Sequence, residues 1–316
     1  MSLHIINPTV RERVDAQLRR ALGPMLGPLE DPNTIEVMRD PDGSVVVETY
    51  RGKHVIGAMS DLQAETLICT VAAIHGQVAN EHHPAIEAEL RIAGARFTGI
   101  LPPMAPAPTI SIRVPSASGY RLEDYAAHGV MTGGQARILR AAVRQRRNLL
   151  IVGATASGKT TLTNTLLAEI EPDERLVILE ELSELRRRSH AYTVYLRTTA
   201  QYDLTRLVRT TMRLKPDRIV IGEVRGGEAL GLLKAWLTGH PGGITTLHAN
   251  GASAALLRLD SLVQEAGVPS QPRLISEAID LIVTIAMTPA GRRITEIATI
   301  NGYDPTTGHR VEPVAG

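Results

Sequence analysis

The segment Gly153–Thr160 constrains the fold of this chain more than any other part of its sequence. It reads Gly-Ala-Thr-Ala-Ser-Gly-Lys-Thr, the pattern of a phosphate-binding loop (Walker A motif). Such a loop joins a buried strand to a helix, so that backbone N–H groups and the helix N-terminus face an anion. The apolar run Asn148–Gly153 predicts the strand, and Thr160–Ile170 predicts the helix. The sequence therefore indicates an α/β domain that binds nucleoside phosphates.

Two side chains of this loop have specific expected roles. Lys159 should be exposed, with its ammonium reaching the β- and γ-phosphates, and the Thr160 hydroxyl should bind Mg²⁺. The expected ligands are ATP and Mg²⁺. The predicted nucleotide-binding residues of the loop are Gly153, Ala154, Thr155, Ala156, Ser157, Gly158, Lys159, Thr160 and Thr161.

Carboxylates follow two other predicted strands. The apolar run Ile219–Glu223 ends in a carboxylate, and we expect Glu223 to orient or polarise the attacking water, or to hold Mg²⁺ through a water. Gly222 stands where such strands usually carry a metal-holding Asp. Glu180 and Glu181 end the preceding strand, at the edge where α/β sheets bind ligands. They are therefore the candidate Mg²⁺ ligands, with nearby Glu184 as either a further candidate or a charged helix start.

The histidines and the single cysteine fall into different classes. His248 ends a predicted strand and could contact a γ-phosphate as a catalytic residue. His240 lies in a glycine-rich turn, and both a role in the site and a structural role stay open for it. His82 and His83 lack further metal ligands at sensible spacing, so a solvated loop is expected. Cys69 should be a core residue on an apolar helix face.

Phosphoryl transfer commonly needs a cation beyond the loop lysine, supplied by another domain or subunit. Arg96 and Arg113, in the first third of the chain, are the candidates for nucleotide contact. Three more arginines lie on the predicted helix Leu204–Leu214, and most arginines there should be surface ion-pair partners. These are Arg206, Arg209 and Arg213.

The chain's 316 residues suggest two domains. Residues 1–113 read as a smaller α+β domain, residues 114–121 as a linker, and residues 122–316 as a RecA-like P-loop domain with a mainly parallel sheet. Strand and helix patterns alternate in the last of these, which favours a sheet covered on both faces. In the first domain the sequence predicts helices over Thr9–Leu26 and Asp61–His75, a hairpin of Thr34–Met38 with Ser44–Tyr50, and strands Phe97–Leu101 and Thr109–Arg113. In the second it predicts helices over Leu122–His128, Thr132–Arg146, Leu204–Leu214 and Gly227–Leu237, and strands Arg175–Glu180, Arg218–Gly222 and Gly243–His248.

Composition limits the partners. A net charge of +1 and an aromatic content of 3% do not favour strong direct binding to nucleic acid, by phosphate neutralisation or by base stacking. No apolar run reaches membrane-spanning length, and the N-terminus lacks a signal-peptide core. A cytoplasmic protein is expected, with peripheral membrane contact through partners.

Taken together, the motifs resemble those of the secretion ATPase superfamily, and within it the conjugative-transfer ATPases of type IV secretion systems. The resemblance covers nearly the whole chain and rests on the phosphate-binding loop and five further segments. These are Gly94–Pro103, Pro108–Pro115, an acidic box Ile178–Leu185, the segment Leu214–Gly226 and a histidine box Gly239–Ala249.

This resemblance implies a homohexameric ring whose subunits hold nucleotide between two domains, at the cytoplasmic base of an inner-membrane machine. The family's acidic box usually reads Glu-Asp, whereas this chain has Glu180-Glu181. The resemblance implies that Glu181 is a catalytic residue that holds Mg²⁺ or positions water. Type II secretion ATPases usually carry a four-cysteine zinc site, which one cysteine cannot supply, and pilus-retraction ATPases differ near the acidic strand. A RecA-like nucleic-acid motor and a non-catalytic nucleotide-binding assembly subunit are the alternatives from other classes.

Overall fold

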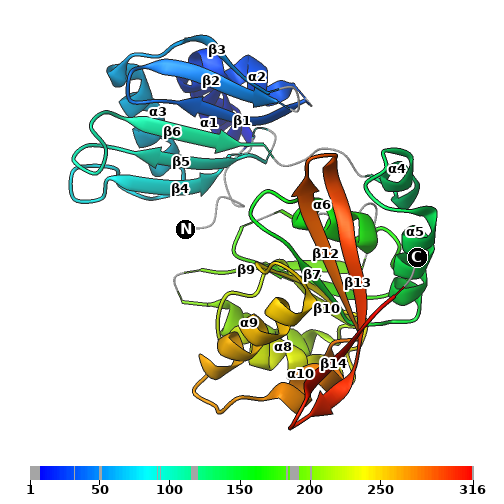
Figure 1. Cartoon of the computed structure of the whole chain (residues 1–316). Coiled ribbons are helices and arrows are strands. Elements are labelled where there is room, and N and C mark those ends of the chain that lie inside the picture. The colour runs from blue at the N-terminus through cyan, green and yellow to red at the C-terminus, as the bar shows by residue number, and fades with distance from the viewer. Residues whose placement is uncertain are drawn as a thin grey trace. The chain divides into compact units, whose positions relative to one another are not determined.

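The computed structural model describes residues 8–31, 33–49, 52–90, 92, 94–114, 120–182, 184–185, 192–199 and 201–314. The chain divides into two compact units, Met1–Ala117 and Ser118–Gly316 (Figure 1). Most of the predicted linker 114–121 lies outside the described residues, and so does Ser183. The assignment of residues 114–121 as a linker therefore stays a prediction.

The first unit is a six-stranded antiparallel sheet in the order β3-β2-β1-β6-β5-β4, with helices packed against it (Figure 1). Its strands are β1 (Thr34–Arg39), β2 (Ser44–Thr49), β3 (Gly52–Ala58), β4 (Ala85–Glu89), β5 (Arg96–Ile100) and β6 (Thr109–Arg113). Its helices are α1 (Pro8–Leu22), the short 3-10 helix η2 (Gly23–Met25), α2 (Leu26–Glu30) and α3 (Asp61–Ile74). Buried and partly exposed residues alternate along the central strands, so that one face of the sheet meets the helices.

Local sequence signals in this unit agree with the structure. The predicted hairpin is β1 paired antiparallel with β2, and its turn uses Gly43 at φ 90°, a conformation that glycine adopts without strain. Ser60 caps the N-terminus of helix α3. Its hydroxyl accepts from the backbone N–H of Gln63, while the Gln63 side chain accepts from the Ser60 N–H. Cys69 is only partly buried, so the expectation of a core cysteine was wrong in degree.

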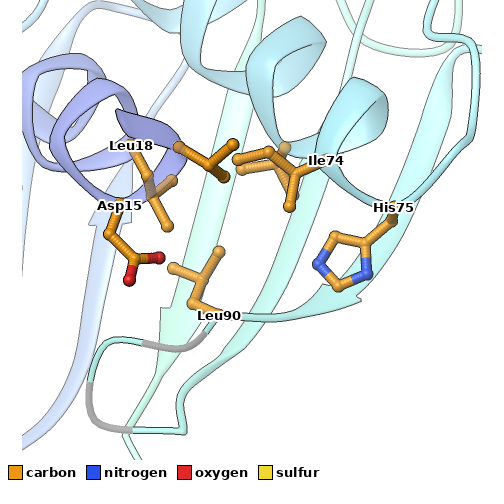
Figure 2. Close-up of a pocket in the computed structure, with 7 residues that line it drawn as sticks. Asp15, Leu18, Ile74, His75 and Leu90 are labelled. Carbon is orange, nitrogen blue, oxygen red and sulfur yellow. The ribbon is translucent and has the colours of Figure 1, made fainter. Parts of the chain in front are cut away.

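A small cavity lies between helices α1 and α3 and the end of β4 (Figure 2). Its volume of about 10 Å³ suits a single water molecule. It is lined by Val14, Asp15, Leu18, Val71, Ile74, His75 and Leu90. A cavity of this size is far too small for a small-molecule ligand.

The second unit is an eight-stranded sheet in the order β14-β13-β12-β7-β11-β10-β8-β9 (Figure 1). The six strands from β12 to β9 pair in parallel, and β13 and β14 add an antiparallel edge. The strands are β7 (Leu149–Val152), β8 (Leu176–Glu180), β9 (Thr193–Arg197), β10 (Arg218–Ile221), β11 (Ile244–Leu247), β12 (Leu281–Thr288), β13 (Gly291–Asp304) and β14 (Gly308–Pro313). The helices are α4 (Leu122–Ala127), α5 (Gly133–Arg144), α6 (Lys159–Leu167), α7 (Leu204–Thr211), η3 (Met212–Leu214), α8 (Glu228–Leu237), α9 (Ala252–Gln264) and α10 (Pro272–Ala278).

Helices cover both faces of this sheet, as the alternating pattern predicted. One core joins the strands to α4, α5 and α6, and a second joins them to α7, α8, α9 and α10. Between these layers the strands β7, β8, β10 and β11 are buried along their whole length. Trp236 of α8 donates from its indole to the carbonyl of Ile219, at 3.0 Å, and packs where Gly243 has no side chain.

The sequence did not predict β3, β4, β9, α9, α10 or the three C-terminal strands. Arg218, the first residue of β10, is 1% exposed and pairs with Glu174. None of the helices in the described ranges is long and apolar enough to cross a membrane.

Candidate functional site

The loop that follows β7 is held by the hairpin of β12 and β13. A Cβ atom at Gly153 would lie 2.2 Å from the carbonyl oxygen of Ile285, so only glycine fits there. Gly158 has φ 101°, and a Cβ there would lie 2.8 Å from Nε of Arg292. Ala156 adopts φ 58°, which is uncommon for a residue with a side chain. The loop therefore has a defined, partly strained backbone immediately before helix α6.

The tip of the loop is open to solvent, whereas its ends are buried. Ala154, Thr155 and Ala156 are exposed, Gly158, Thr160 and Thr161 are half-buried, and Gly153 and Ser157 are buried. The buried Oγ of Ser157 has no hydrogen-bond partner among the described residues. Because backbone N–H groups of the exposed turn precede a helix N-terminus, the loop can receive an anion from solvent.

Lys159 does not project into solvent, and the expectation of an exposed lysine was wrong. It is 7% exposed, and its Nζ donates to the carbonyls of Gly153 and Ala154 at 2.9 and 3.0 Å. The same Nζ lies 3.2 Å from Nδ1 of His248. The carbonyls of the loop hold the ammonium in place, because a buried cation without partners would be costly.

A continuous polar network runs from this lysine across the carboxyl ends of the strands. Nε2 of His248 lies 2.8 Å from Oε1 of Glu223, and Arg225 Nε donates to Oε2 of Glu223 at 2.6 Å. Arg225 also reaches Oε2 of Glu181 at 3.2 Å. Because Lys159 is a donor only, Nδ1 of His248 accepts, and its Nε2–H donates to Glu223. The structure thus brings together Lys159, His248, Glu223 and Glu181.

A second cluster contains the candidate metal ligands. The Thr160 hydroxyl donates to Oε2 of Glu184 at 3.0 Å. Glu180 is 4% exposed, and its Oε1 accepts from the backbone N–H groups of Glu184 and Leu185. Burial raises the pKa of Glu180 to about 7, against these hydrogen bonds, which lower it. Glu180 therefore supports the turn that carries Glu184, and the carboxylate beside Thr160 belongs to Glu184 and not to the predicted Glu180 or Glu181.

Other candidates lie elsewhere. Nδ1 of His240 is 2.7 Å from the carbonyl oxygen of Pro216, at the amino end of β10, whereas the loop follows the carboxyl end of a parallel strand. His240 is thus a structural residue. Arg96 and Arg113 face each other across β5 and β6 in the first unit, and Glu36 of β1 is the other neighbour of Arg113. Like charges directly opposite on a sheet repel, so this pair favours an anionic neighbour.

Comparisons with known proteins identify the family of the chain. Residues 87–299 match the family described as type II/IV secretion system protein. The chain is 46% identical over 297 residues to the probable conjugal transfer protein TrbB of Sinorhizobium fredii, which covers 92% of this chain and 91% of that protein. This chain belongs to the type II/IV secretion system protein family.

Solved structures show the same architecture. The VirB11 ATPase from the Brucella suis type IV secretion system is 28% identical, with a TM-score of 0.51 over 92% of this chain and 96% of that one. The Legionella pneumophila ATPase DotB has a TM-score of 0.63 at 21% identity, over 95% of this chain and 83% of that one. The second likeness concerns the fold alone.

Two residues of this secretion-system protein were missed from the sequence. Arg225 joins Glu223 to Glu181, and Arg292 lies against the loop. Arg225 stands two residues after Glu223 in the segment Leu214–Gly226, so its position next to a candidate catalytic carboxylate was a usable signal. Arg292 is remote in sequence, and only the pairing of β12 with β13 brings it to the loop.

Proposed function

We propose that this protein is an ATP-hydrolysing motor of a type IV secretion or conjugative DNA transfer system. The observation that carries the proposal is the network of Lys159, His248 and Glu223 beside a phosphate-binding loop. A loop that only held nucleotide as a structural ligand would not need a carboxylate paired with a histidine at the γ-phosphate end. The conjugal transfer relative, similar over nine-tenths of both chains, supports the choice of machine.

The roles follow from the positions of the side chains. Lys159 would leave the carbonyls of Gly153 and Ala154 to bind β- and γ-phosphoryl oxygens. Glu223 would orient the attacking water and accept its proton. His248, in contact with both Lys159 and Glu223, would register the γ-phosphate and transmit its loss.

Thr160 and Glu184 would hold Mg²⁺, which neutralises charge between the β- and γ-phosphates. Among the described residues no three His, Cys, Asp or Glu side chains form a metal site of their own. This suits Mg²⁺, which proteins usually bind through one or two oxygens together with substrate phosphates and water. Glu181, whose carboxylate accepts from Arg225, would accept hydrogen bonds from water bound to Mg²⁺.

The wider assembly is also part of the proposal. The second unit would be a RecA-like domain, the first an α+β domain that closes on the nucleotide, and residues 114–121 the hinge between them. Six subunits would form a ring at the cytoplasmic base of an inner-membrane machine. Arg96 and Arg113 would contact the nucleotide from the first domain of the same or a neighbouring subunit, and no strong direct grip on nucleic acid is expected.

Phosphate release from purified protein with ATP and Mg²⁺ tests the proposal. The parent should hydrolyse ATP, and Lys159→Ala should reduce the rate to background while retaining the circular dichroism spectrum of the parent. Lys234→Ala, on the exposed side of α8, is the matched control and should retain the parent rate. A Lys159→Ala variant that hydrolyses ATP near the parent rate would show that the site assignment is wrong.

A further inference from the structure

The guanidinium of Arg292, a residue of the C-terminal hairpin, lies against the phosphate-binding loop. Strands β12 and β13 lie side by side (Figure 1). Arg292 is the second residue of β13 and pairs with Met287 of β12. Its Nη2 donates to the carbonyl of Ala156 at 3.3 Å, a long hydrogen bond. An ideal Cβ at Gly158 would lie 2.8 to 3.1 Å from Nε, Cδ and Cζ of this side chain. The arginine therefore packs directly on the backbone just before Lys159.

The donors of Arg292 are poorly satisfied. Its Nε is buried without a hydrogen-bond partner, and in the described part of the chain no carboxylate pairs with it. A buried donor of a guanidinium without an acceptor is costly, since neither water nor protein replaces its solvation. Arg225, the arginine of the polar network, is different, because it binds two carboxylates. A ligand with acceptor oxygens at this end of the loop would offset the lost solvation of the Arg292 donors.

We propose that Arg292 binds the diphosphate part of the nucleotide, as a cation supplied within the same subunit and the same unit of the chain. The inference rests on the proposed nucleotide site and deepens it. Guanidinium donates from Nε and Nη in a fixed fork that suits phosphoryl oxygens. The glycine at 158 lets this fork approach the backbone that cradles the phosphates. Arg292 is a phosphate-binding residue here, and Lys159 remains the one that reaches the γ-phosphate.

Arg293 provides a matched control in the adjacent position. Successive side chains of a strand point to opposite faces, so the Arg293 side chain points away from the loop. Its Nη1 donates to the carbonyl of Arg292. Both arginines carry the same charge and belong to the same strand. A difference between their variants therefore reports contact with the ligand and not net charge.

Equilibrium binding of a fluorescent ADP without turnover tests the inference. Arg292→Gln should weaken ADP binding by about tenfold, the size expected for one charge-assisted contact. Arg292→Lys should weaken it less, and Arg293→Gln should match the parent. Because the contact is to phosphate, Arg292→Gln should also weaken the binding of inorganic pyrophosphate by the same factor. The dissociation constant of pyrophosphate is measured by its competition with the fluorescent ADP.

The outcomes are separable. A parent that does not bind ADP overturns the proposed function and this inference with it. A parent that binds ADP while Arg292→Gln binds equally well overturns this inference alone. Unchanged pyrophosphate displacement beside weakened ADP binding would place Arg292 at the ribose or base and also contradict it. If Arg292→Gln unfolds at a lower temperature than the parent, Arg292→Lys is the variant that tests the contact. An ADP affinity between that of the parent and background supports the contact. Parent affinity for both ADP and pyrophosphate contradicts it.

Discussion

Nε2 of His248 lies 2.8 Å from Oε1 of Glu223, while the other ring nitrogen lies 3.2 Å from Nζ of Lys159. The imidazole therefore touches at once the cation that should bind the γ-phosphate and the carboxylate that should orient water. A movement of Lys159 toward a phosphate would therefore change the contact between its Nζ and Nδ1 of His248. If the proposed function holds, His248 is the residue through which phosphate binding would reach Glu223.

Glu223→Gln should separate binding from hydrolysis. The amide keeps an oxygen for His248 and leaves the loop intact, but it cannot accept a proton from water. We expect ATP affinity within about threefold of the parent and turnover reduced by at least about a hundredfold. Fluorescent-nucleotide binding and phosphate release measure the two effects. Weakened binding with unchanged turnover would instead assign Glu223 a structural role.

The buried ion pair of Arg218 and Glu174 should be important for the stability of the second unit. Arg218 donates to both oxygens of Glu174, at 2.8 and 2.6 Å, and to the carbonyls of Val143 and Gly242. Arg218→Met should lower the free energy of unfolding by about 3–5 kcal/mol, because those acceptors lose a buried donor. Urea titration measures the loss. Arg147→Ala, which removes an exposed pair with Asp280, should cost less than about 1 kcal/mol; equal losses would contradict the prediction.

The sequence predicted most of the second unit's central strands, because strands buried on both faces read as continuous apolar runs bounded by turns. It failed for strands without that signal. β3 is exposed along its whole length, so no alternation marks it, and β13 runs fourteen residues with mixed polarity. The long C-terminal hairpin is also where Arg292 lies, so an unrecognised strand pair hid a candidate site residue.

Within the site, the sequence identified residue types but not their pairing. Strand-end positions were enough to select Glu223 and His248, since carboxyl ends of parallel strands share one edge. They did not show that Lys159 would fold back on loop carbonyls, or that Glu184 and not Glu180 would meet Thr160. Those outcomes depend on a turn after β8, where the buried carboxylate of Glu180 accepts two backbone N–H groups.

The elevated pKa of Glu180 has a consequence for stability. Its pKa is about 7 in the folded chain and 4.5 for an ordinary glutamate, so between these values the folded state holds more protons than the unfolded state. The free energy of unfolding should therefore fall as pH rises from 4.5 to 7, by at most about 3 kcal/mol at about 1.36 kcal/mol per pKa unit. The loss is complete only well above pH 7, where Glu180 is ionised in both states.

Glu180→Gln should remove this pH dependence, because an amide oxygen still accepts from Glu184 and Leu185 but carries no charge. We expect the variant to match the parent near pH 5 and to be more stable near pH 8, as measured by urea unfolding at each pH. Glu312→Gln, an exposed glutamate of β14, is the control and should follow the parent. A variant that is less stable than the parent at pH 8 would show that Glu180 is ionised without penalty.

The last prediction is that catalysis needs the ring. Arg113 is exposed at the end of β6, beside Arg96, in a different unit from the loop. If these cations complete the site, they reach it by domain closure or from a neighbouring subunit, and transferring phosphoryl charge needs such a cation for full rate. We therefore expect phosphate release per subunit to rise with protein concentration as rings assemble. Arg113→Ala should lower turnover about tenfold or more, with little change in the unfolding midpoint. Arg19→Ala, which changes an exposed arginine of α1, should alter neither. Activity per subunit that stays constant while light scattering shows the assembly falling to monomers would contradict the requirement for a ring.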